Sequence, residues 1–406
     1  MSPHLEESPA LQHIPRPECS ASIASEAYIM SITALPSRYA IAPSAPSTSI
    51  DLLDSASLRF VQSFPGHEGG VSALRTIRSV AGLTRPALVS SGRDGSVKVW
   101  DERSNAHSIK MTDLGKSRAI LSVDVSPDGL TVAGGTDLQG EDATILYWDP
   151  RQPAAPLRAH SSTHSDDITA LHFSPFDPTG CTLLSASSDG LLSVSNAAED
   201  DEDEAVVHVA NWGCSISQAG WVGAGGAKGA IWAASDMETF STWSGELERY
   251  SSLDIKIPAV QRIDRPWVTD YLITSHSTGD PEHPLAVFVG SNEGDIALIS
   301  ERPSTTPSSS PSWTLHKKWL NGHAGVVRSL LWDESNSVLV TGGEDSKLNV
   351  WSLEGPTVDD GDDAMELDDG ADAANHTHDA SYRGRKRGAS WDDGDEMSQE
   401  GKRARR

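Results

Sequence analysis

The amino-acid sequence predicts an all-β protein, a single seven-bladed β-propeller that is followed by a disordered C-terminal tail. A strand pattern that ends in tryptophan recurs along the chain at nearly even steps. The chain contains 34 Gly and 23 Pro, which suits a fold with many tight turns. Its 406 residues are enough for one closed all-β domain with a sizeable core. We expect residues 1–10 to be disordered, 11–354 to form the propeller and 355–406 to form the tail.

Two segments, which begin at Gly66 and Gly322, carry the repeat most clearly. Each has Gly-His, an alternating strand, a small-residue strand that ends at an Asp, and a further strand that ends at a Trp. This order is the signature of the WD40 repeat, in which four short strands form one propeller blade of about 40–45 residues.

Degenerate copies of the repeat lie before and between these segments. The positions that correspond to the closing Trp are Leu53, Trp100, Trp148, Ser195, Trp243, Ile299 and Trp351. They are separated by 47, 48, 47, 48, 56 and 52 residues, so the seven positions predict seven blades. The two longer steps contain the stretches 251–284 and 302–312, of which the second is a polar linker.

Polar residues at fixed places in the two best copies predict a buried hydrogen-bond relay within a blade. The relay residues are His67, Ser90, Asp94 and Trp100 in blade 2, and His323, Thr341, Asp345 and Trp351 in blade 7. We expect the Asp to accept hydrogen bonds from the His ring and from turn amides, and the Trp indole to donate to the hydroxyl. Such a relay is stable only when every member is paired, because unpaired buried polar groups are costly.

The recurrence of Ser, His and Asp also permits a catalytic interpretation. Blade 4 has the same three residue types in His164, Ser185 and Asp189, although Ser195 stands where the Trp is expected. Because the set recurs at positions that determine the fold, a structural role explains it. The sequence has neither a GxSxG nor an HExxH motif, and the Gly-rich run 220–229 lacks the ending of a phosphate-binding loop. We predict a protein that is not an enzyme, with no catalytic residues, cofactor or metal site.

Closure of the ring requires one strand from the other end of the chain, because an incomplete blade would leave a sheet edge open. Blade 7 has three strands up to Leu353, so we expect its outer strand within residues 11–22. Pro15 and Pro17 weaken this segment as a ladder partner, but an outer edge strand tolerates Pro.

The net charge of −26 limits the classes of partner. Acidic runs at residues 199–204 and 359–369 are expected to be solvated and unstructured. Alternatively, they imitate nucleic acid and attract basic proteins such as histones or ribosomal proteins. Direct nucleic-acid binding is not expected, because contacts with phosphates dominate that affinity.

The cysteines and the N-terminus indicate an intracellular protein. Cys19, Cys181 and Cys214 form no CxxC pair, which argues against a disulfide or zinc framework and favours a reducing compartment. The first 20 residues lack the apolar segment of a signal peptide, and no stretch approaches 18 apolar residues. We therefore expect no contact with a membrane.

The order of irregularities resembles the WD repeat-containing protein 89 family. The similar features are the insertion near Gly140, the lost Trp at Ser195 before an acidic run, the segment 215–223, and a last repeat that precedes a basic tail. The resemblance implies a propeller that acts as an intracellular scaffold without enzymatic activity. The insertion at 302–312 and the longer acidic segment in the tail depart from the family's pattern.

Two adjacent blades carry the motif W-D-x-R, at residues 100–103 and 148–151. The pair resembles the double box of substrate receptors of cullin-4 ubiquitin ligases, which implies that Arg103 and Arg151 contact the ligase adaptor. Arg suits such a contact because its planar fork donates two parallel hydrogen bonds. The alternative is that each Arg only caps a turn.

Two basic clusters in the tail, separated by 14 residues, resemble a bipartite nuclear-import signal and make importin a candidate partner. The candidate residues are Arg383, Arg385, Lys386, Arg387, Lys402, Arg403, Arg405 and Arg406. They predict a nuclear protein that can shuttle to the cytoplasm. The alternative is a plain basic tail, or one that folds back on the acidic run.

Propellers usually bind partners over the central channel, on the face that holds the loops before each inner strand. The residues just before each blade's Asp position should line that rim: Arg93, Ser188, Ser235, Asn292 and Glu344. The sequence therefore predicts a non-catalytic scaffold for other proteins. The alternatives are a cullin-4 substrate receptor and an acidic chaperone for histones or ribosomal proteins.

Overall fold

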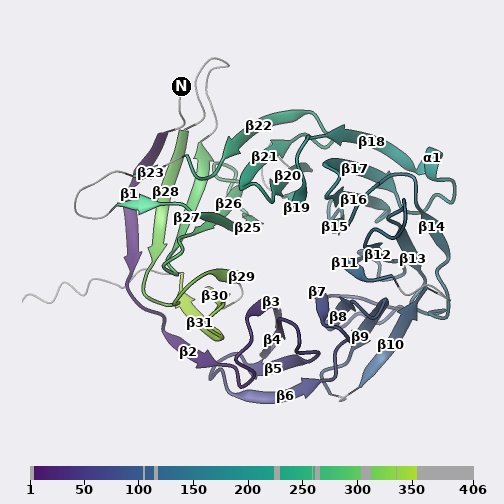
Figure 1. The fold of residues 1–406 in the computed structure, drawn as a ribbon, viewed down its shortest axis with the longest axis horizontal. Helices are drawn as coiled ribbons and strands as arrows, with labels where there is room; N and C mark the ends of the chain where they lie inside the picture. Colours follow the sequence, from purple (N-terminus) through teal and green to yellow (C-terminus); the bar gives the residue numbers. More distant parts are fainter. Residues whose placement is uncertain are drawn as a thin grey trace, which may run out of the picture. The chain divides into compact units, whose positions relative to one another are not determined.

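Seven β-sheets surround a central channel in the computed structural model (Figure 1), which confirms the predicted propeller. The structure describes residues 4–103, 106–113, 118–223, 229–257, 259–260, 266–302, 312–334 and 336–353. The predicted tail, 355–406, and its import residues lie outside this part of the chain. None of the described helices is long and apolar enough to span a membrane.

The first four blades are regular four-stranded sheets. Blade 1 consists of β3 (Ile29–Leu35), β4 (Arg38–Pro43), β5 (Ile50–Asp54) and β6 (Phe60–Phe64). Blade 2 consists of β7 (Val71–Ile77), β8 (Ala87–Gly92), β9 (Ser96–Trp100) and β10 (His107–Thr112). Blade 3 consists of β11 (Ile120–Val125), β12 (Val132–Thr136), β13 (Ile145–Trp148) and β14 (Arg158–His160). Blade 4 consists of β15 (Ile168–Phe173), β16 (Thr182–Ser187), β17 (Leu191–Asn196) and β18 (Val206–Asn211).

The last three blades include the strands that the N-terminus supplies. Blade 5 consists of β19 (Ile216–Val222), β20 (Ala230–Ser235), β21 (Thr239–Trp243) and β22 (Arg249–Asp254). A small pair, β23 (Ala259–Val260) and β24 (Trp267–Val268), precedes blade 6. Blade 6 consists of β25 (Tyr271–Ser277), β26 (Leu285–Gly290), β27 (Ile296–Arg302), β28 (Ser312–Trp319) and β1 (His4–Ile14). Blade 7 consists of β29 (Val327–Asp333), β30 (Val338–Gly343), β31 (Lys347–Ser352) and β2 (Cys19–Ser22).

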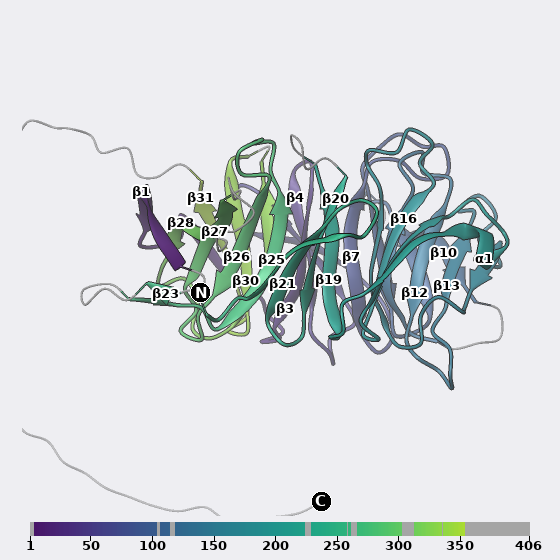
Figure 2. The same cartoon turned by 90° about the horizontal axis from the view of Figure 1, so that it is seen from above.

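The strand registers divide the propeller into two faces, which lie at opposite ends of the strands in the edge-on view of Figure 2. In blade 2, Val71 pairs with Gly92, and Ser96 pairs with Thr112. The loop before the first strand and the loop between the second and third strands therefore lie at the same end of the blade. We call this end the relay face, because the His and Asp of the expected relays lie in these loops.

Each inner strand has an irregularity in register near its start, and in β11 and β29 a serine beside it forms a hydrogen bond to the next blade. In β11 it lies between Ile120 and Ser122, and the Ser122 hydroxyl donates to the carbonyl of Ile168 in blade 4 at 2.7 Å. Ser329 of blade 7 likewise donates to the carbonyl of Ile29 in blade 1 at 2.8 Å. These bonds join neighbouring blades in addition to the apolar packing between their sheets.

The expected ring closure is made by β2, which lies within residues 11–22. It pairs antiparallel with β31, with Cys19 opposite Val350 and Ser22 opposite Lys347. Pro15 and Pro17 lie in the link before β2 and take no part in its ladder.

The expectation of disorder in residues 1–10 is wrong for the described residues from His4 on. These residues belong to β1, which adds a fifth, parallel strand to the outer edge of β28. The physical reason is burial: Leu5 and Ile14 are 7% and 6% exposed and pack into the apolar cores of blades 5–6 and 6–7. The pairing is interrupted between Glu7 and Gln12. The sequence did not predict this strand, because an edge strand with one buried apolar side chain near each end shows little of the alternating pattern by which strands are recognised.

The acidic run 199–204 was expected to be unstructured, and the structure shows that this is wrong. It contains a short helix, α1 (Glu202–Ala205), which Asp201 caps. The Glu202 carboxylate accepts hydrogen bonds from the backbone N–H groups of Ser161, Ser162 and Thr163 at 2.7, 2.9 and 2.8 Å. Three consecutive amides after the end of β14 need an acceptor, and a carboxylate is a strong one.

Candidate functional site

The blade 2 relay has the expected hydrogen bonds. The Trp100 indole donates to the Ser90 hydroxyl at 2.8 Å, and that hydroxyl lies 2.7 Å from His67 Nε2. His67 Nδ1 lies 2.8 Å from Asp94 Oδ1. Because the hydroxyl accepts from Trp100, its own proton points to Nε2, and the Nδ1 proton points to Asp94. Each link of the relay is thus paired, as a buried polar network requires.

Blade 7 repeats this geometry. Trp351 donates to the Thr341 hydroxyl at 2.9 Å, and His323 lies 2.8 Å from that hydroxyl and 3.0 Å from Asp345. Asp345 also accepts from the backbone N–H of Ala324 at 3.0 Å, which fixes the loop before β29 to the loop after β30.

A fifth relay residue, which the sequence did not predict, lies two positions before each Trp. In blade 2 it is Lys98, whose ammonium donates to the Gly66 carbonyl at 2.6 Å and to Asp94 at 3.0 Å. In blade 7 the equivalent Asn349 donates to the Gly322 carbonyl at 2.8 Å. In the sequence, the feature that could have revealed Lys98 is its position between two valines in a strand whose other residues are expected to be buried.

Burial and hydrogen bonds together set the charges of the relay. Burial lowers the pKa of His67 and His323, although the neighbouring Asp opposes the effect, so both rings are neutral at pH 7. Burial alone would raise the pKa of Asp94, but hydrogen bonds from His67, Ser96 and Lys98 outweigh it, and the net pKa is lowered. The relay thus consists of a carboxylate, a neutral imidazole, a hydroxyl and an indole.

Blade 4 shows the relay without its Trp. His164 Nε2 lies 2.8 Å from the Ser185 hydroxyl, but its Nδ1 is 3.4 Å from Asp189 and forms no hydrogen bond among the described residues. Ser195, at the Trp position, is 4% exposed. A smaller side chain in place of an indole leaves the hydroxyl of Ser185 without the donor that fixes the other two relays.

Three segments of the chain, residues 58–101, 154–194 and 313–352, match the family model described as WD domain, G-beta repeat. Together with the seven blades and the relays, this match shows that the chain is similar to WD40-repeat propellers.

The WD40 propeller is similar to curated proteins along most of its length. It is 25% identical over 328 residues to the WD repeat-containing protein 89 homolog of Dictyostelium discoideum, which covers 80% of this chain and 82% of that protein. It is 28% identical over 325 residues to the WD repeat-containing protein GTS1 of Arabidopsis thaliana, covering 77% of this chain and 78% of that protein. The resemblance that the sequence predicted is confirmed at this level of similarity.

A shorter stretch is similar to a ribosomal protein. It is 33% identical over 129 residues to the small ribosomal subunit protein RACK1 of Neurospora crassa, covering 32% of this chain and 37% of that protein.

Four of the five expected rim residues of the WD40 propeller reach the surface of the relay face. Arg93 and Asn292 are exposed, and Ser188 and Glu344 are half-buried. Glu344 accepts from the Arg328 guanidinium at 2.8 Å, so its charge is partly used within the chain.

Ser235 is not a rim residue, because it is 4% exposed. Its hydroxyl lies 2.6 Å from that of Thr239 and accepts from the N–H of Met237 at 3.1 Å. The seven-residue step from Asp236 to Trp243, one more than in blade 2, shifts the turn by one position. Asp236 is therefore the exposed residue at this place on the rim.

The two W-D-x-R motifs have the same geometry, on the face opposite the relay face. Arg103 donates to Asp101 at 3.1 and 2.9 Å, and Arg151 donates to Asp149 at 2.9 and 2.7 Å. Each Arg caps the turn after its Trp, while 69% and 55% of the two side chains stay exposed. An adaptor would have to compete with these internal ion pairs.

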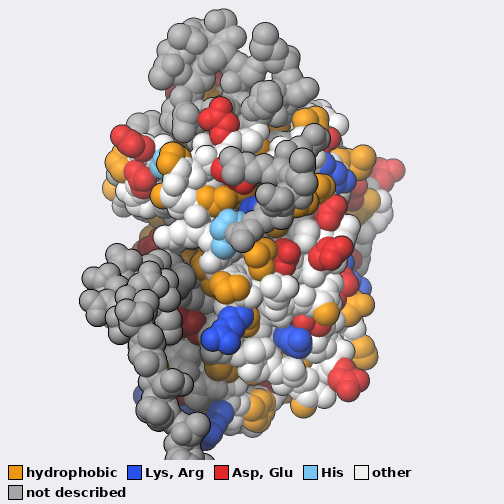
Figure 3. Space-filling view, turned by 90° about the vertical axis from the view of Figure 1, so that its left-hand side faces the viewer, with side chains coloured by type: hydrophobic (Ala, Val, Ile, Leu, Met, Phe, Trp, Pro, Cys, Tyr) orange, Lys and Arg blue, Asp and Glu red, His pale blue; other side chains and the backbone are white. Residues whose placement is uncertain are grey.

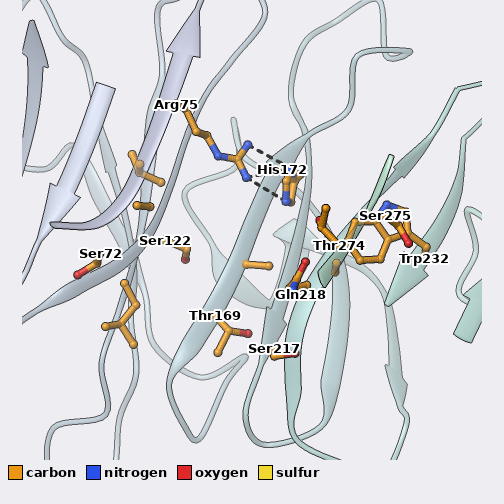
Figure 4. A pocket seen from close by; sticks show the side chains of 15 residues that line it. Ser72, Arg75, Ser122, Thr169, His172, Ser217, Gln218, Trp232, Thr274 and Ser275 are labelled. Atoms are coloured by element: carbon orange, nitrogen blue, oxygen red, sulfur yellow. Dashed lines mark hydrogen bonds between the residues drawn. The ribbon is translucent and has the colours of Figure 1, made fainter. Parts of the chain in front are cut away.

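The channel of the WD40 propeller contains a cavity of about 320 Å³ (Figure 4), which the sequence did not predict. Arg75 of blade 2 reaches across blade 3 to His172 of blade 4, with its Nη2 3.0 Å from the ring Nε2. Its Nη1 lies 3.3 Å from Asp124 of blade 3. Burial, together with Arg75, lowers the pKa of His172, so the ring is neutral and accepts from the guanidinium. These contacts link three blades at the channel wall.

Histidine and hydrophobic side chains gather on the side of the molecule that carries β1 and β28 (Figure 3). Here blades 6 and 7 enclose a cavity of about 200 Å³, lined by His283, His316 and Trp332. The Ser300 hydroxyl lies between the two rings, 3.2 Å from His283 and 2.8 Å from His316. Among the described residues, no group of three or more His, Cys, Asp or Glu could hold a metal ion.

Proposed function

We propose that this WD40 propeller is a non-catalytic scaffold that binds other proteins through its relay face and acts in the nucleus. The observation that carries the proposal is the contrast within that face. Buried relays fix the loops of blades 2 and 7 from below, and Arg93 is exposed at the tip of the blade 2 loop, as Asn292 is in the corresponding loop of blade 6. A rigid loop loses little conformational freedom when it binds, which favours affinity.

The face is tested by site-specific photo-crosslinking in cells. A crosslinking amino acid at Arg93 or Asn292 should capture discrete partner proteins. The same group at Glu246, an exposed residue in the loop between β21 and β22 on the opposite face, should not. Equal capture at all three positions would refute the role of the relay face.

The nuclear part of the proposal rests on the two basic clusters at 383–387 and 402–406. Replacing the Lys and Arg residues of both clusters by Ala should keep a fluorescent fusion protein in the cytoplasm. A fusion that stays nuclear would refute import through this signal.

A second candidate function, a substrate receptor of a cullin-4 ligase, is favoured by the matching geometry of Arg103 and Arg151 on adjacent blades. The double variant Arg103→Ala, Arg151→Ala should then lose association with the ligase adaptor. If the double variant binds the adaptor as well as the unaltered chain does, or if the unaltered chain does not bind it, this function is refuted and the two arginines only cap their turns.

The third candidate, an acidic chaperone, gains support from the similarity to a protein named as a small ribosomal subunit protein. The run 199–204 is partly occupied by internal hydrogen bonds, so the run 359–369 would have to carry most of the binding. Deletion of 359–369 should abolish binding to core histones if this function is correct, and leave it unchanged if it is not.

A further inference from the structure

We propose that the cavity in the channel binds a small phosphorylated polyol, with the phosphate at Arg75 and the polyol hydroxyls along the wall beside it. This is the cavity of about 320 Å³ in Figure 4, and its walls are mainly the inner strands β7, β11, β15, β19 and β25 of blades 2 to 6. We call it the channel cavity. The proposal goes beyond the scaffold function, which concerns proteins that bind the relay face and does not depend on a small ligand.

The charge of the channel cavity favours an anion. Arg75 is the one ionised side chain among the lining residues, which include no Asp, Glu or Lys, and 31% of it is exposed. Asp124 does not line the cavity but lies 3.3 Å from Nη1 of Arg75 and compensates part of its charge. Burial raises the pKa of Asp124, because its charged form is poorly solvated. In a chain with 58 acidic residues, an exposed cation without a carboxylate beside it on the cavity wall attracts anions.

The contact between Arg75 and His172 leaves hydrogen-bond donors without an acceptor. Arg75 Nη1 lies 3.2 Å from Nδ1 of the ring, and Nη2 lies 3.2 Å from Nδ1 and 3.0 Å from Nε2. A neutral imidazole has one acceptor nitrogen, its other nitrogen carries a hydrogen, and a protonated ring has no acceptor. In either state a ring N–H faces the N–H groups of Arg75, and no described residue accepts from it.

An anionic oxygen beside these two side chains would supply the missing acceptor. Arg75 Nε also donates to no described residue, so the guanidinium keeps a further N–H for a ligand. Phosphate suits this place because its oxygens accept several charge-assisted hydrogen bonds at once, and a guanidinium matches their spacing.

Hydroxyl groups make up most of the polar wall of the channel cavity (Figure 4). Ser72 and Thr274 are half-buried, and their hydroxyls form no hydrogen bond with another described residue. Gln218 Nε2 donates to the Ile273 carbonyl at 2.9 Å, which fixes the amide while its oxygen has no described donor. Because a hydroxyl both donates and accepts, this wall fits the hydroxyls of a polyol better than a bare anion.

The size of the channel cavity and its apolar part agree with such a ligand. Its volume of about 320 Å³ is at the lower end of the range of about 300–1,000 Å³ for small-molecule sites. Trp232 lines it beside Ser275 and supplies an apolar surface for the C–H groups of a polyol ring.

The test measures binding of the full chain to inositol monophosphate by isothermal titration calorimetry, with inositol and inorganic phosphate as comparison ligands. Inositol monophosphate should bind at least about tenfold more tightly than either, because it alone meets both Arg75 and the hydroxyl wall. Binding of inorganic phosphate that is equally tight would mean that the cavity takes an adventitious ion only. That result, or no binding of any of the three, would overturn the proposal.

The residue at the centre of the proposal is tested by Arg75→Gln, which loses the charge. This variant should weaken binding of inositol monophosphate about tenfold or more. The matched control is Arg328→Gln, which removes an arginine that pairs with Glu344 and does not line the channel cavity. It should change the affinity less than about twofold. Equal weakening by both variants, or by neither, contradicts the assignment of the phosphate to Arg75.

A second variant keeps the proposal testable if Arg75→Gln does not fold, since Arg75 links three blades. Thr274→Val keeps the shape of the side chain and removes one hydroxyl of the wall. It should weaken binding of inositol monophosphate about threefold and leave that of inorganic phosphate unchanged. Thr84→Val, in the exposed part of the loop between β7 and β8, is its control and should alter neither. If Thr274→Val binds inositol monophosphate as the unaltered chain does, the hydroxyl wall does not hold the ligand and the proposal falls.

Discussion

At the scale of single residues, the relays explain how loops on one face are fixed by side chains in the core. Each relay leads from a buried indole, through a hydroxyl and an imidazole, to a carboxylate that holds turn amides. The two full relays differ at one position, where Lys98 of blade 2 corresponds to Asn349 of blade 7. Both donate to the carbonyl of the Gly before the relay His, but only the lysine brings a charge.

Lys98→Met should lower the free energy of unfolding by about 1–3 kcal/mol, because the Gly66 carbonyl and Asp94 both lose a donor. Lys98→Asn, which copies blade 7, should lose less, because an amide at this position reaches the carbonyl. Urea denaturation of the two variants measures the difference. If the methionine variant is as stable as the asparagine variant, the buried ammonium contributes nothing through these contacts.

The pH dependence of stability follows from the relay histidines. Burial lowers the pKa of His67 and His323 in the folded chain, so the unfolded chain binds protons more readily. Their contribution is complete above the unfolded pKa of about 6.5 and is lost as the pH falls toward the folded values. Urea titrations between about pH 8 and pH 5 should therefore show falling stability, and His67→Asn with His323→Asn should flatten the curve. Constant stability of the unaltered chain over this range would contradict the argument.

At the scale of elements, inner strands carry the links between blades and outer strands carry the irregularities. The inner strands share a register irregularity that places Ser122 and Ser329 against the next blade. Outer strands vary more: β14 has three residues, β28 follows the insertion, and β1 adds a parallel strand. Substitutions in outer strands meet fewer neighbours, which explains why the repeat is hardest to recognise there.

Deletion of residues 1–14 removes β1 and should lower the free energy of unfolding by about 2 kcal/mol, since Leu5 and Ile14 leave the core and the edge of β28 is exposed. The lost burial is partly offset by the entropy that the freed segment gains. Chemical denaturation measures the change. Leu5→Ser should reproduce part of it, and a deletion variant of unchanged stability would show that β1 is only loosely attached.

At the scale of the whole molecule, stability depends on closing the ring. β2 and β31 come from opposite ends of the described chain, and without β2 the last blade would keep three strands and an open edge. Each blade packs on two neighbours, so a gap anywhere exposes two sheet surfaces.

Deletion of residues 1–22 should therefore have a much larger effect than deletion of 1–14. We expect the longer deletion to remove the single cooperative transition that tryptophan fluorescence and circular dichroism should share in the intact chain. The shorter deletion should retain it. If both deletions melt alike, β2 does not hold the ring closed.

The sequence by itself determined the number of blades, the two full relays and the resemblance to a family. Those features depend on contacts within one repeat, where spacing along the chain fixes spacing in the fold. For example, the three-residue loop between β8, which ends at Gly92, and β9, which ends at Trp100, follows directly from the spacing of these residues in the sequence.

Only the tertiary structure decided which residues from different blades meet. Arg75, Asp124 and His172 lie on three blades, and Glu202 reaches amides that belong to the end of another blade. It also decided that the N-terminus is ordered from His4 on and that Ser235 is buried in its turn. Contacts between blades depend on how neighbouring sheets are rotated and packed around the channel. The spacing of the repeats along the sequence does not specify that rotation.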